Sequence, residues 1–453
     1  MKERMFDALA ASGADYTQIL LEESDSTRFG YRGRELEDTA SGKVTRGMVR
    51  ACFRGGWCEC VFQSPEDLPR AVREASAGAR LIGRGRTELA EAAPPEIRQF
   101  PVVFKEDFRG VPLDRKIELV RGYNEEMLAG DDIESTETWY SESFRRVWFA
   151  SSRGVWWERE IPRQRLAMIA LARRGDQVQR GVETITGMED FSIFRDRTDL
   201  ARQAAERASA LLRAPRCESR RTTVILDPKL AGVFIHEAFG HLSEADFMYE
   251  NPRLREMMQL GREIGVPELN VYDDGGLEGL SGSIPVDDEG TPAGRTMLVT
   301  GGVLTGHLHS LETAARMGER PTGNARAENA ARTPQVRMTN TGIANGTLTP
   351  EQLFAGVDDG VYVCSSYGGE TMLENFTFIA GYAYRIRHGE IGELLRDVTL
   401  VGNVFDTLHA IDGIANDAGR DNLFNGICGK GGQSVPVTAS SPHLRIRDVL
   451  LGG

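Results

Sequence analysis

The amino-acid sequence predicts an α+β protein in two parts, an N-terminal α/β domain over residues 1–213 and a β-rich C-terminal domain over residues 222–453. At 453 residues the chain is too long for one ordinary hydrophobic core. Before residue 214, segments with helical spacing alternate with strand-like runs, whereas after residue 222 glycine is frequent and short apolar runs dominate. The segment 214–221, with Pro215 and a cluster of charges, separates the two parts.

In the first part, helices are predicted over residues 66–82, 115–128 and 199–212. Leu68, Val72 and Ala75 recur at spacings of three and four, which places them on one helical face. Asp199 is a good N-cap for the third helix. Residues 147–158 predict a β-hairpin, because Arg153-Gly154 separates two aromatic-rich runs.

The second part is predicted to be mostly β with one important helix. The predicted strands lie at residues 297–299, 361–364, 376–386 and 398–401. Turn signals such as Asp274-Gly275 and Asn345-Gly346 separate such runs.

The overall charge and the cysteine content favour a soluble cytoplasmic protein. The formal net charge of −13 repels phosphate backbones, so nucleic acid is not expected as a direct partner. We expect no membrane association, since no window approaches ~18 consecutive apolar residues and the start does not resemble a signal peptide. Six cysteines in a chain of this length favour free thiols or metal ligands over disulfides.

The most informative segment begins at a predicted strand, Thr222–Leu226, which is β-branched and apolar. Asp227 then caps a helix and Pro228 occupies its first turn, the favoured order of these two residue types. His236 and Glu237 fall late in that helix. The segment therefore predicts a strand–helix unit that presents a histidine and a carboxylate together.

Two histidines with an adjacent glutamate suit hydrolytic zinc chemistry. Neutral imidazoles of His236 and His241 can bind zinc, and Glu237 can take a proton from water that the zinc polarises. Their spacing is five residues, which puts His241 roughly 140° around a straight helix from His236. We therefore expect the helix to bend or end between them, with Gly240 supplying the freedom. The alternative is that either imidazole is a hydrogen-bonded core residue.

Cys428 is the candidate third ligand. It lies in the glycine-rich segment 425–434, which we interpret as a loop whose backbone can approach a site closely. A thiolate is a good zinc ligand, and the metal would lower its pKa. The alternative is a buried, inert cysteine.

Five ordered motifs resemble the TldD/PmbA family of metallopeptidases, strongly over residues 220–453. The motifs are His236–Asp246, Val286–Pro292, Pro321–Arg326, Arg337–Asn340 and Cys428–Pro436. The resemblance implies a zinc ion held by His236, His241 and Cys428, with Glu237 as the base. It also implies cleavage of unstructured peptides and pairing with a PmbA-like paralogue that lacks the metal motif. This chain keeps the motif and so resembles the active TldD-type subunit, working as a dimer with that paralogue or with itself.

Other polar residues near these motifs have two interpretations each. Glu244 and Asp246 could orient a histidine or be ordinary loop carboxylates. The acidic run 287–289 could bind a hard cation, but a solvated turn is the commoner outcome. Asn324 and Arg326 could bind a peptide backbone or terminus.

His307 and His309 alternate in a strand-like segment and so face one side. They could form a second metal site, although exposed strand histidines are commoner. Their role is left open between these two outcomes.

Two functions from different classes fit the sequence. The first is a zinc-dependent peptidase, and the second is a non-catalytic, metal-stabilised peptide-binding or regulatory subunit. Glu237 favours the first, because a structural zinc site needs no base and commonly fills all four positions with protein ligands. A serine or cysteine hydrolase using Ser434 or Cys428 is disfavoured, since no nucleophile-elbow pattern surrounds either residue.

Overall fold

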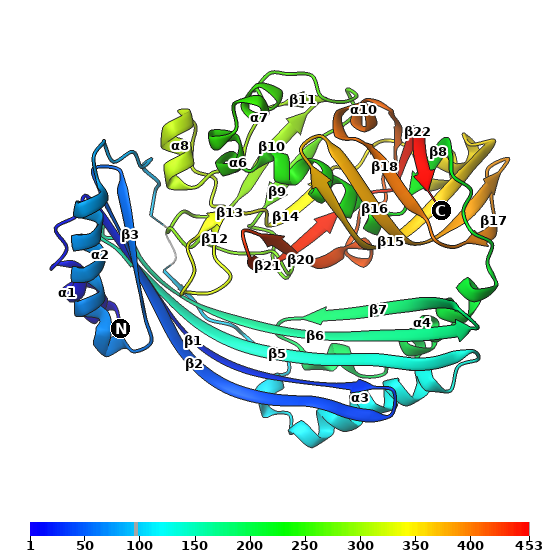
Figure 1. Ribbon diagram of the computed structural model, residues 1–453, viewed down its shortest axis with the longest axis horizontal. Coiled ribbons are helices and arrows are strands. Elements are labelled where there is room, and N and C mark those ends of the chain that lie inside the picture. The colour runs from blue at the N-terminus through cyan, green and yellow to red at the C-terminus, as the bar shows by residue number, and fades with distance from the viewer. Residues whose placement is uncertain (95–97, 453) are drawn as a thin grey trace.

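The computed structural model describes residues 1–94 and 98–452. A long, curved sheet from the N-terminal half lies along one side, and the C-terminal half packs against its concave face (Figure 1). In the part of the chain that the structure describes, no helix is long and apolar enough to cross a membrane. The mixed α and β architecture with a β-rich C-terminal part is confirmed. The division at residues 213 and 222 stays a prediction, and Gly453 lies outside the described residues.

The curved sheet is antiparallel apart from one short strand, and its order is β3-β2-β1-β5-β6-β4, with β7 also paired to β6. Its strands are β1 (Tyr16–Arg32), β2 (Glu35–Phe53), β3 (Gly56–Phe62), β4 (Gln99–Phe100), β5 (Ile133–Ser151), β6 (Trp156–Arg174) and β7 (Gln177–Gly187). The predicted hairpin at 147–158 is confirmed as the β5–β6 connection. Its strands run far beyond the predicted ends, because polar residues also pair along the solvated parts of the sheet.

Four helices cover apolar patches of this sheet. They are α1 (Lys2–Leu9), α2 (Leu68–Ile82), α3 (Leu113–Leu128) and α4 (Thr198–Arg213), so all three predicted helices are confirmed. The first two pack at one end of the sheet and the other two at the opposite end. Asp199 is not the N-cap of α4 as predicted, since the helix begins one residue earlier and Asp199 lies in its first turn. A carboxylate there still favours the positive end of the helix dipole.

The C-terminal half contains two further large sheets and a two-stranded ribbon. The first sheet has the order β11-β10-β9-β14-β21-β20: β9 (Val271–Asp274), β10 (Arg295–Thr300), β11 (Val303–Leu304), β14 (Asn340–Ile343), β20 (Phe424–Lys430) and β21 (Gln433–Ser440). The second contains β8 (Arg220–Leu226), β15 (Asp359–Met372), β16 (Asn375–Arg387), β17 (Glu390–Leu395), β18 (Thr399–Asn403), β19 (Ile411–Ile414) and β22 (Leu444–Gly452). Pairing of β15 with β16 closes part of this sheet on itself. The ribbon is β12 (Ala325–Arg326) with β13 (Gln335–Val336).

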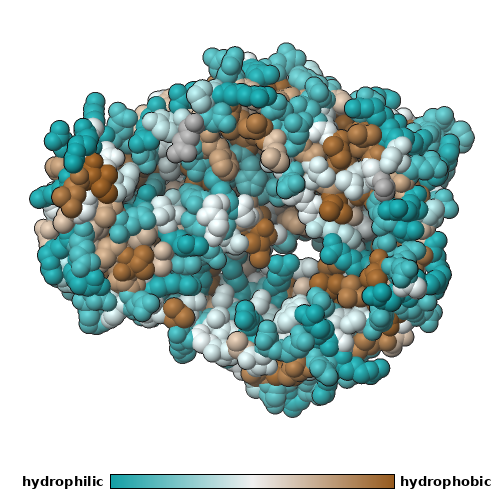
Figure 2. All heavy atoms as spheres, viewed as in Figure 1, coloured by the Kyte–Doolittle hydropathy of each residue, from teal (hydrophilic) through white to brown (hydrophobic). Residues whose placement is uncertain are grey.

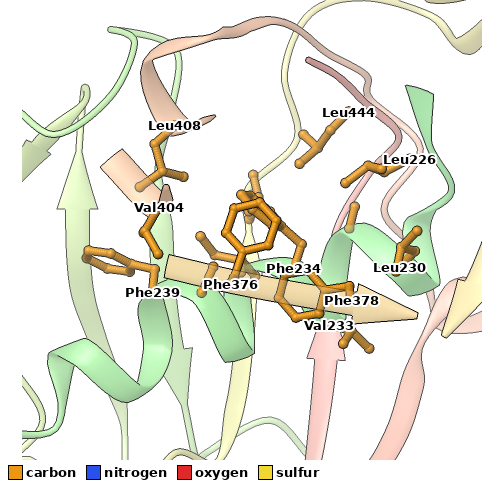
Figure 3. Packing of buried hydrophobic residues seen from close by; sticks show 14 of the residues in the cluster. Leu226, Leu230, Val233, Phe234, Phe239, Phe376, Phe378, Val404, Leu408 and Leu444 are labelled. Carbon is orange, nitrogen blue, oxygen red and sulfur yellow. The ribbon is translucent and has the colours of Figure 1, made fainter. Parts of the chain in front are cut away.

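The expected strand–helix unit is present and lies in the core of this half. Helix α5 (Pro228–Ile235) follows β8 and contacts both large sheets. Phe234 packs edge-on against Phe376 at 5.5 Å and Phe378 at 6.1 Å between ring centroids, within a buried apolar cluster (Figure 3). The unit is therefore fixed from both sides, which holds the end of α5 rigidly.

The metal-motif helix is not the sole helix among the described residues of this half. Five further short helices lie in its loops: α6 (Ala245–Glu250), α7 (Pro252–Met257), α8 (Leu311–Met317), α9 (Pro350–Ala355) and α10 (Val404–His409). Each has only six or seven residues, too few for a clear hydrophobic period, although Ser310 and Thr349 form capping boxes that mark two of them.

Buried charges join the two halves. Glu22 on β1 is fully buried, pairs with Arg46 and Arg145, and accepts a hydrogen bond from the Ala330 backbone of the C-terminal half (3.2 Å). The acidic run at 287–289 lies at the same junction and is buried, so the expectation of a solvated turn is wrong. Its carboxylates bind backbone N–H groups and the arginines of the curved sheet.

We predict that Glu22→Ala lowers the free energy of unfolding by about 3–5 kcal/mol, because two arginines lose their buried partner. Burial raises the pKa of Glu22, but Arg145 and Arg46 lower it more, so the net shift is downward. Its contribution is therefore complete above the unfolded pKa of about 4.3 and is lost as the pH falls through the lower folded-state pKa. Urea unfolding of both proteins across the acid range measures this.

Glu118→Ala is the matched control, since Glu118 pairs with Arg115 on an exposed helix face. That substitution should change stability by less than about 1 kcal/mol. Equal effects of the two substitutions would show that the junction does not depend on the buried charge.

Candidate metal centre

The metal-motif helix begins as the sequence predicts. Asp227 accepts a hydrogen bond from the Leu230 backbone (2.7 Å) and another from the Ser365 backbone (3.0 Å), and Pro228 occupies the first turn. The cap therefore fixes α5 to the neighbouring strand β15 as well as starting the helix. This anchoring sets the position of His236, which follows α5 directly.

The five-residue spacing is accommodated by a π-helical turn, His236–Gly240. The backbone N–H of His241 donates to the carbonyl of His236, an i→i+5 bond that widens the turn by one residue and brings both histidines to one side. The expected break at Gly240 is wrong, because Gly240 has ordinary helical angles (φ −56°, ψ −47°). Glycine is needed there for space, since an added Cβ would lie 2.0 Å from the Met338 sulfur.

The predicted ligands His236, His241 and Cys428 come together. One potential ligand atom from each lies within 4.8 Å of the other two, and the Cys428 Sγ is 3.4 Å from His241 Nε2. The two imidazole rings are 5.4 Å apart and nearly perpendicular. His236 is 3% exposed, and within the described part of the chain neither of its ring nitrogens has a hydrogen-bond partner. A buried imidazole without partners is costly unless something else binds it.

Glu244 determines which nitrogen of His241 faces the cluster. It is fully buried, and its Oε2 lies 3.0 Å from His241 Nδ1. Burial raises the pKa of Glu244, but Lys430 and His241 lower it to about 2, so its carboxylate only accepts hydrogen bonds. His241 therefore carries a proton on Nδ1, which leaves Nε2 as the nitrogen that faces Cys428 and that would bind a metal ion, as second-shell carboxylates arrange for metal ligands.

Cys428 lies in strand β20 and not in a loop as predicted. The glycines after it form the hairpin turn to β21, where Gly431 and Gly432 both have positive φ. Burial raises the pKa of the Cys428 thiol, but His236 and His241 beside it lower that pKa to about 5. The thiol is thus held where its thiolate form is favoured, the form that binds metals.

Lys430, two residues after Cys428, is a site residue that the sequence reasoning missed. Its ammonium group is 7% exposed and donates to Glu244 (3.0 Å), Asp246 (2.6 Å) and the Val336 carbonyl (2.8 Å). All three of its donors are used. Glu244 and Asp246 thus bind the hairpin that carries Cys428, and a lysine within the C-terminal motif was the available signal.

Asn324 and Arg326 are buried and make contacts within the chain. Asn324 donates to Asp273 (2.8 Å) and to the Arg337 carbonyl (3.0 Å), while Arg326 donates to the carbonyls of Met338 and Pro436. These bonds leave neither side chain directed at a peptide.

Arg337, also missed, is fully buried and donates to the Cys428 carbonyl (2.6 Å). The β13 segment and its continuation therefore support Cys428 from behind. His307 and His309 are buried too, at 3% and 1% exposure, so the commoner outcome of exposed histidines is wrong here.

The residues present fit a zinc ion. Two imidazoles and a thiolate are a normal zinc donor set, and the partnerless nitrogens of His236 are accounted for if one of them binds the ion. Glu237 reaches the same cluster, with its Oε2 3.7 Å from His241 Nε2 and its side chain 26% exposed. Burial raises the pKa of Glu237, which brings its basicity closer to that of a proton acceptor at neutral pH.

Strand β20 separates this cluster from a cavity of about 560 Å³ between the curved sheet and the β20–β21 hairpin. Ile427 lines the cavity, whereas the neighbouring Cys428 contributes to the cluster, as expected where side chains alternate along a strand. Figure 2 shows an opening between the two halves of the molecule. Among the described residues β20 is the last strand of its sheet, so its outer edge has no strand partner.

We predict that Gly240→Val lowers the stability of the protein by about 1–3 kcal/mol and weakens zinc binding, because the side chain cannot fit beside buried Met338. Gly240→Ala should show a smaller effect, which Met338→Ala should partly reverse by making room. Competition with a chelator measures zinc affinity.

Gly122→Ala is the matched control, since Gly122 lies within α3 and an added Cβ there meets nothing within 4 Å. Normal zinc affinity in Gly240→Val would show that the π-helical turn tolerates a side chain.

Known proteins are similar to this chain over both of its halves. Residues 219–453 match the family model described as the PmbA/TldA metallopeptidase C-terminal domain, and residues 106–212 match the central domain. A metalloprotease of Synechocystis is 42% identical over 98% of this chain and 96% of its own length. A zinc metalloprotease TldD homolog of Saccharolobus solfataricus is 32% identical over 70% of each chain.

The solved structure of TldE from Thermococcus kodakarensis has the same fold, with a TM-score of 0.75 at 15% identity over 99% of this chain and all of that one. The family model of the C-terminal domain alone spans more than half of the chain. Together with the two metalloprotease relatives, these matches extend over both halves of the structure. The chain belongs to the TldD/PmbA family of metallopeptidases.

Proposed function

We propose that the chain is a zinc-dependent peptidase that hydrolyses flexible or unfolded peptides, with zinc on His236, His241 and Cys428 and with Glu237 as general base. The observation that carries the proposal is the convergence of two imidazoles, a thiol and a carboxylate at one buried point. A bound zinc ion would supply Lewis-acid chemistry, polarising a carbonyl and lowering the pKa of water.

The surrounding residues have separable roles in this proposal. Glu237 accepts a proton from the attacking water and passes it to the leaving amine. Glu244 keeps His241 in the tautomer that presents Nε2, and Lys430 holds Glu244 ionised. The alternative, a non-catalytic metal-stabilised subunit, does not explain why the Glu237 carboxylate lies beside the ligands and is partly exposed to solvent.

Peptide access is proposed to occur along the free edge of β20. An extended peptide added there would alternate its side chains between the cavity and the metal cluster, since Ile427 and Cys428 do the same. Main-chain pairing needs no particular sequence, so specificity should be broad. An added Cβ at Gly429 would meet nothing within 4 Å, so the face of β20 at this residue is open.

We also propose a dimer, formed with a PmbA-like paralogue or with a second copy, in the cytoplasm. The family resemblance supports the pairing. The six free cysteines, with one thiolate in the candidate metal site, suit a reducing compartment.

Glu237→Gln should abolish peptide cleavage, with a rate loss of about 10²–10⁴, while zinc content and circular dichroism stay normal. The amide keeps the shape but cannot accept the proton. Peptide digestion followed by mass spectrometry, with metal analysis of the same sample, measures both quantities.

Cys428→Ala is the contrasting variant, and it should lose the zinc ion of this site together with the activity. If Glu237→Gln digests peptides at nearly the normal rate, the base lies elsewhere. If Cys428→Ala still binds zinc at His236 and His241, the third ligand is misassigned.

One substrate protein, offered at equal concentration in native and in unfolded form, should be cleaved only when unfolded. A folded protein must first open locally, at a cost in free energy, before a strand can reach β20. Light scattering on the active sample gives the mass of the assembly.

Peptides N-methylated on alternate backbone nitrogens provide the sharper control, because methylation removes the donors needed for pairing with an edge. Equal cleavage of native and unfolded substrate would contradict the access route. An active monomer would contradict the dimer.

A further inference from the structure

A second cluster of metal-ligating side chains lies apart from the candidate centre. His307, His309 and Glu319 each place a potential ligand atom within 4.8 Å of the others. Both histidines are buried, at 3% and 1% exposure, and the Glu319 side chain is 21% exposed. The histidines precede α8 and Glu319 follows it, so the cluster closes a short loop of the chain.

His307 has only one free ring nitrogen, and that nitrogen faces a carboxylate. Its Nε2 lies 2.8 Å from the Met258 carbonyl, which can only accept, so Nε2 carries the hydrogen. Its Nδ1 lies 2.9 and 3.2 Å from the two oxygens of Glu319. In a neutral imidazole this contact would join a lone pair to a carboxylate, so a cation, either a proton or a metal ion, must lie between them.

His309 distinguishes between these two cations. Its Nε2 is buried and lies 3.2 Å from Glu319 Oε2, yet among the residues that the structure describes this nitrogen has no hydrogen-bond partner. A proton bridge requires a nearly straight N–H···O line. A metal ion needs no such straight line. It lies off the line between two ligand atoms, at the point where their lone pairs meet.

We propose that His307 Nδ1, His309 Nε2 and the Glu319 carboxylate form a second zinc site, distinct from the one at Cys428, that braces the surrounding chain. Two imidazoles and a carboxylate are a normal donor set for zinc, and the exposed side of Glu319 leaves room for water as a fourth ligand. The Met258 carbonyl orients His307 from its other nitrogen, as second-shell groups do.

An ion at the second site would hold the Leu308 backbone, which is hydrogen-bonded to the segment around Glu244. Leu308, between the two histidines, donates to the Ser243 carbonyl (2.8 Å) and accepts from the Ala245 N–H (3.0 Å). These residues flank Glu244, the partner of His241. An ion at the second site therefore braces the segment that orients a ligand of the first.

The test reconstitutes metal-free protein with excess zinc, removes unbound metal by desalting and counts the ions per chain. Wild type should retain two, Glu319→Gln and His309→Gln one each, Cys428→Ala one, and Cys428→Ala/Glu319→Gln none. Glu312→Gln is the matched control and should retain two ions. Glu312 lies on α8, between the histidines and Glu319 in the chain, but pairs with Arg316 outside the cluster. Circular dichroism verifies that each variant is folded.

Cobalt in place of zinc identifies each site by its donors, because a thiolate–cobalt bond gives a near-ultraviolet charge-transfer band that nitrogen and oxygen ligands do not give. Glu319→Gln should lose one ion and keep the band, whereas Cys428→Ala should lose the band and keep one ion. A folded Cys428→Ala protein that retains no ion, or a wild type with a single thiolate-bound ion, overturns the second site and leaves the proposed peptidase intact. A band that survives in Cys428→Ala overturns the peptidase ligand set instead.

Discussion

The candidate metal centre depends on one buried ammonium group. Lys430 and Cys428 lie on the same strand, whereas Glu244 and His241 lie almost two hundred residues earlier, and the Lys430–Glu244 contact joins these segments at 3.0 Å. A carboxylate with no exposure cannot stay ionised without such a partner. Because Glu244 is ionised, His241 has a fixed tautomer, and because the tautomer is fixed, Nε2 faces the thiol. Removing the lysine would therefore disturb the tautomer, the strand and the thiolate together.

Buried carboxylates are also paired with cationic side chains where the two halves meet. Asp288 and Glu289 of the C-terminal half are buried, and each pairs with an arginine of the curved sheet. Buried pairs of this kind add little to stability compared with apolar residues of similar size, but they are specific, because a shifted interface leaves charges unpaired. The curved sheet is thereby held in one position over the β20–β21 hairpin. The cavity between them and the free edge of β20 follow from that position.

Local signals in the sequence predict the parts of the site that local chemistry determines. The strand before Asp227, its cap and Pro228 are present as predicted, since each depends on residues within one turn. The π-helical turn was not predictable, because it is stabilised by packing of Gly240 against Met338, about a hundred residues away. The sequence predicts a loop at Cys428 for a similar reason, since glycines that form a hairpin turn also suit a loop. The resemblance to the family is what identifies the three candidate ligands as one set from the sequence.

The two histidine clusters orient an imidazole in the same way but differ in the residues around it. In each, a buried acceptor binds one nitrogen of an imidazole, Glu244 for His241 and the Met258 carbonyl for His307, so that the other nitrogen faces inward. The neighbours then differ. The first cluster adds a thiol, a partly exposed carboxylate in Glu237 and an adjacent open sheet edge, which together allow a substrate and a base to meet. Among the described residues, the second cluster adds one carboxylate, Glu319, which already contacts both of its histidines. The catalysis proposed for the first cluster and the bracing proposed for the second thus follow from the surroundings of otherwise similar imidazoles.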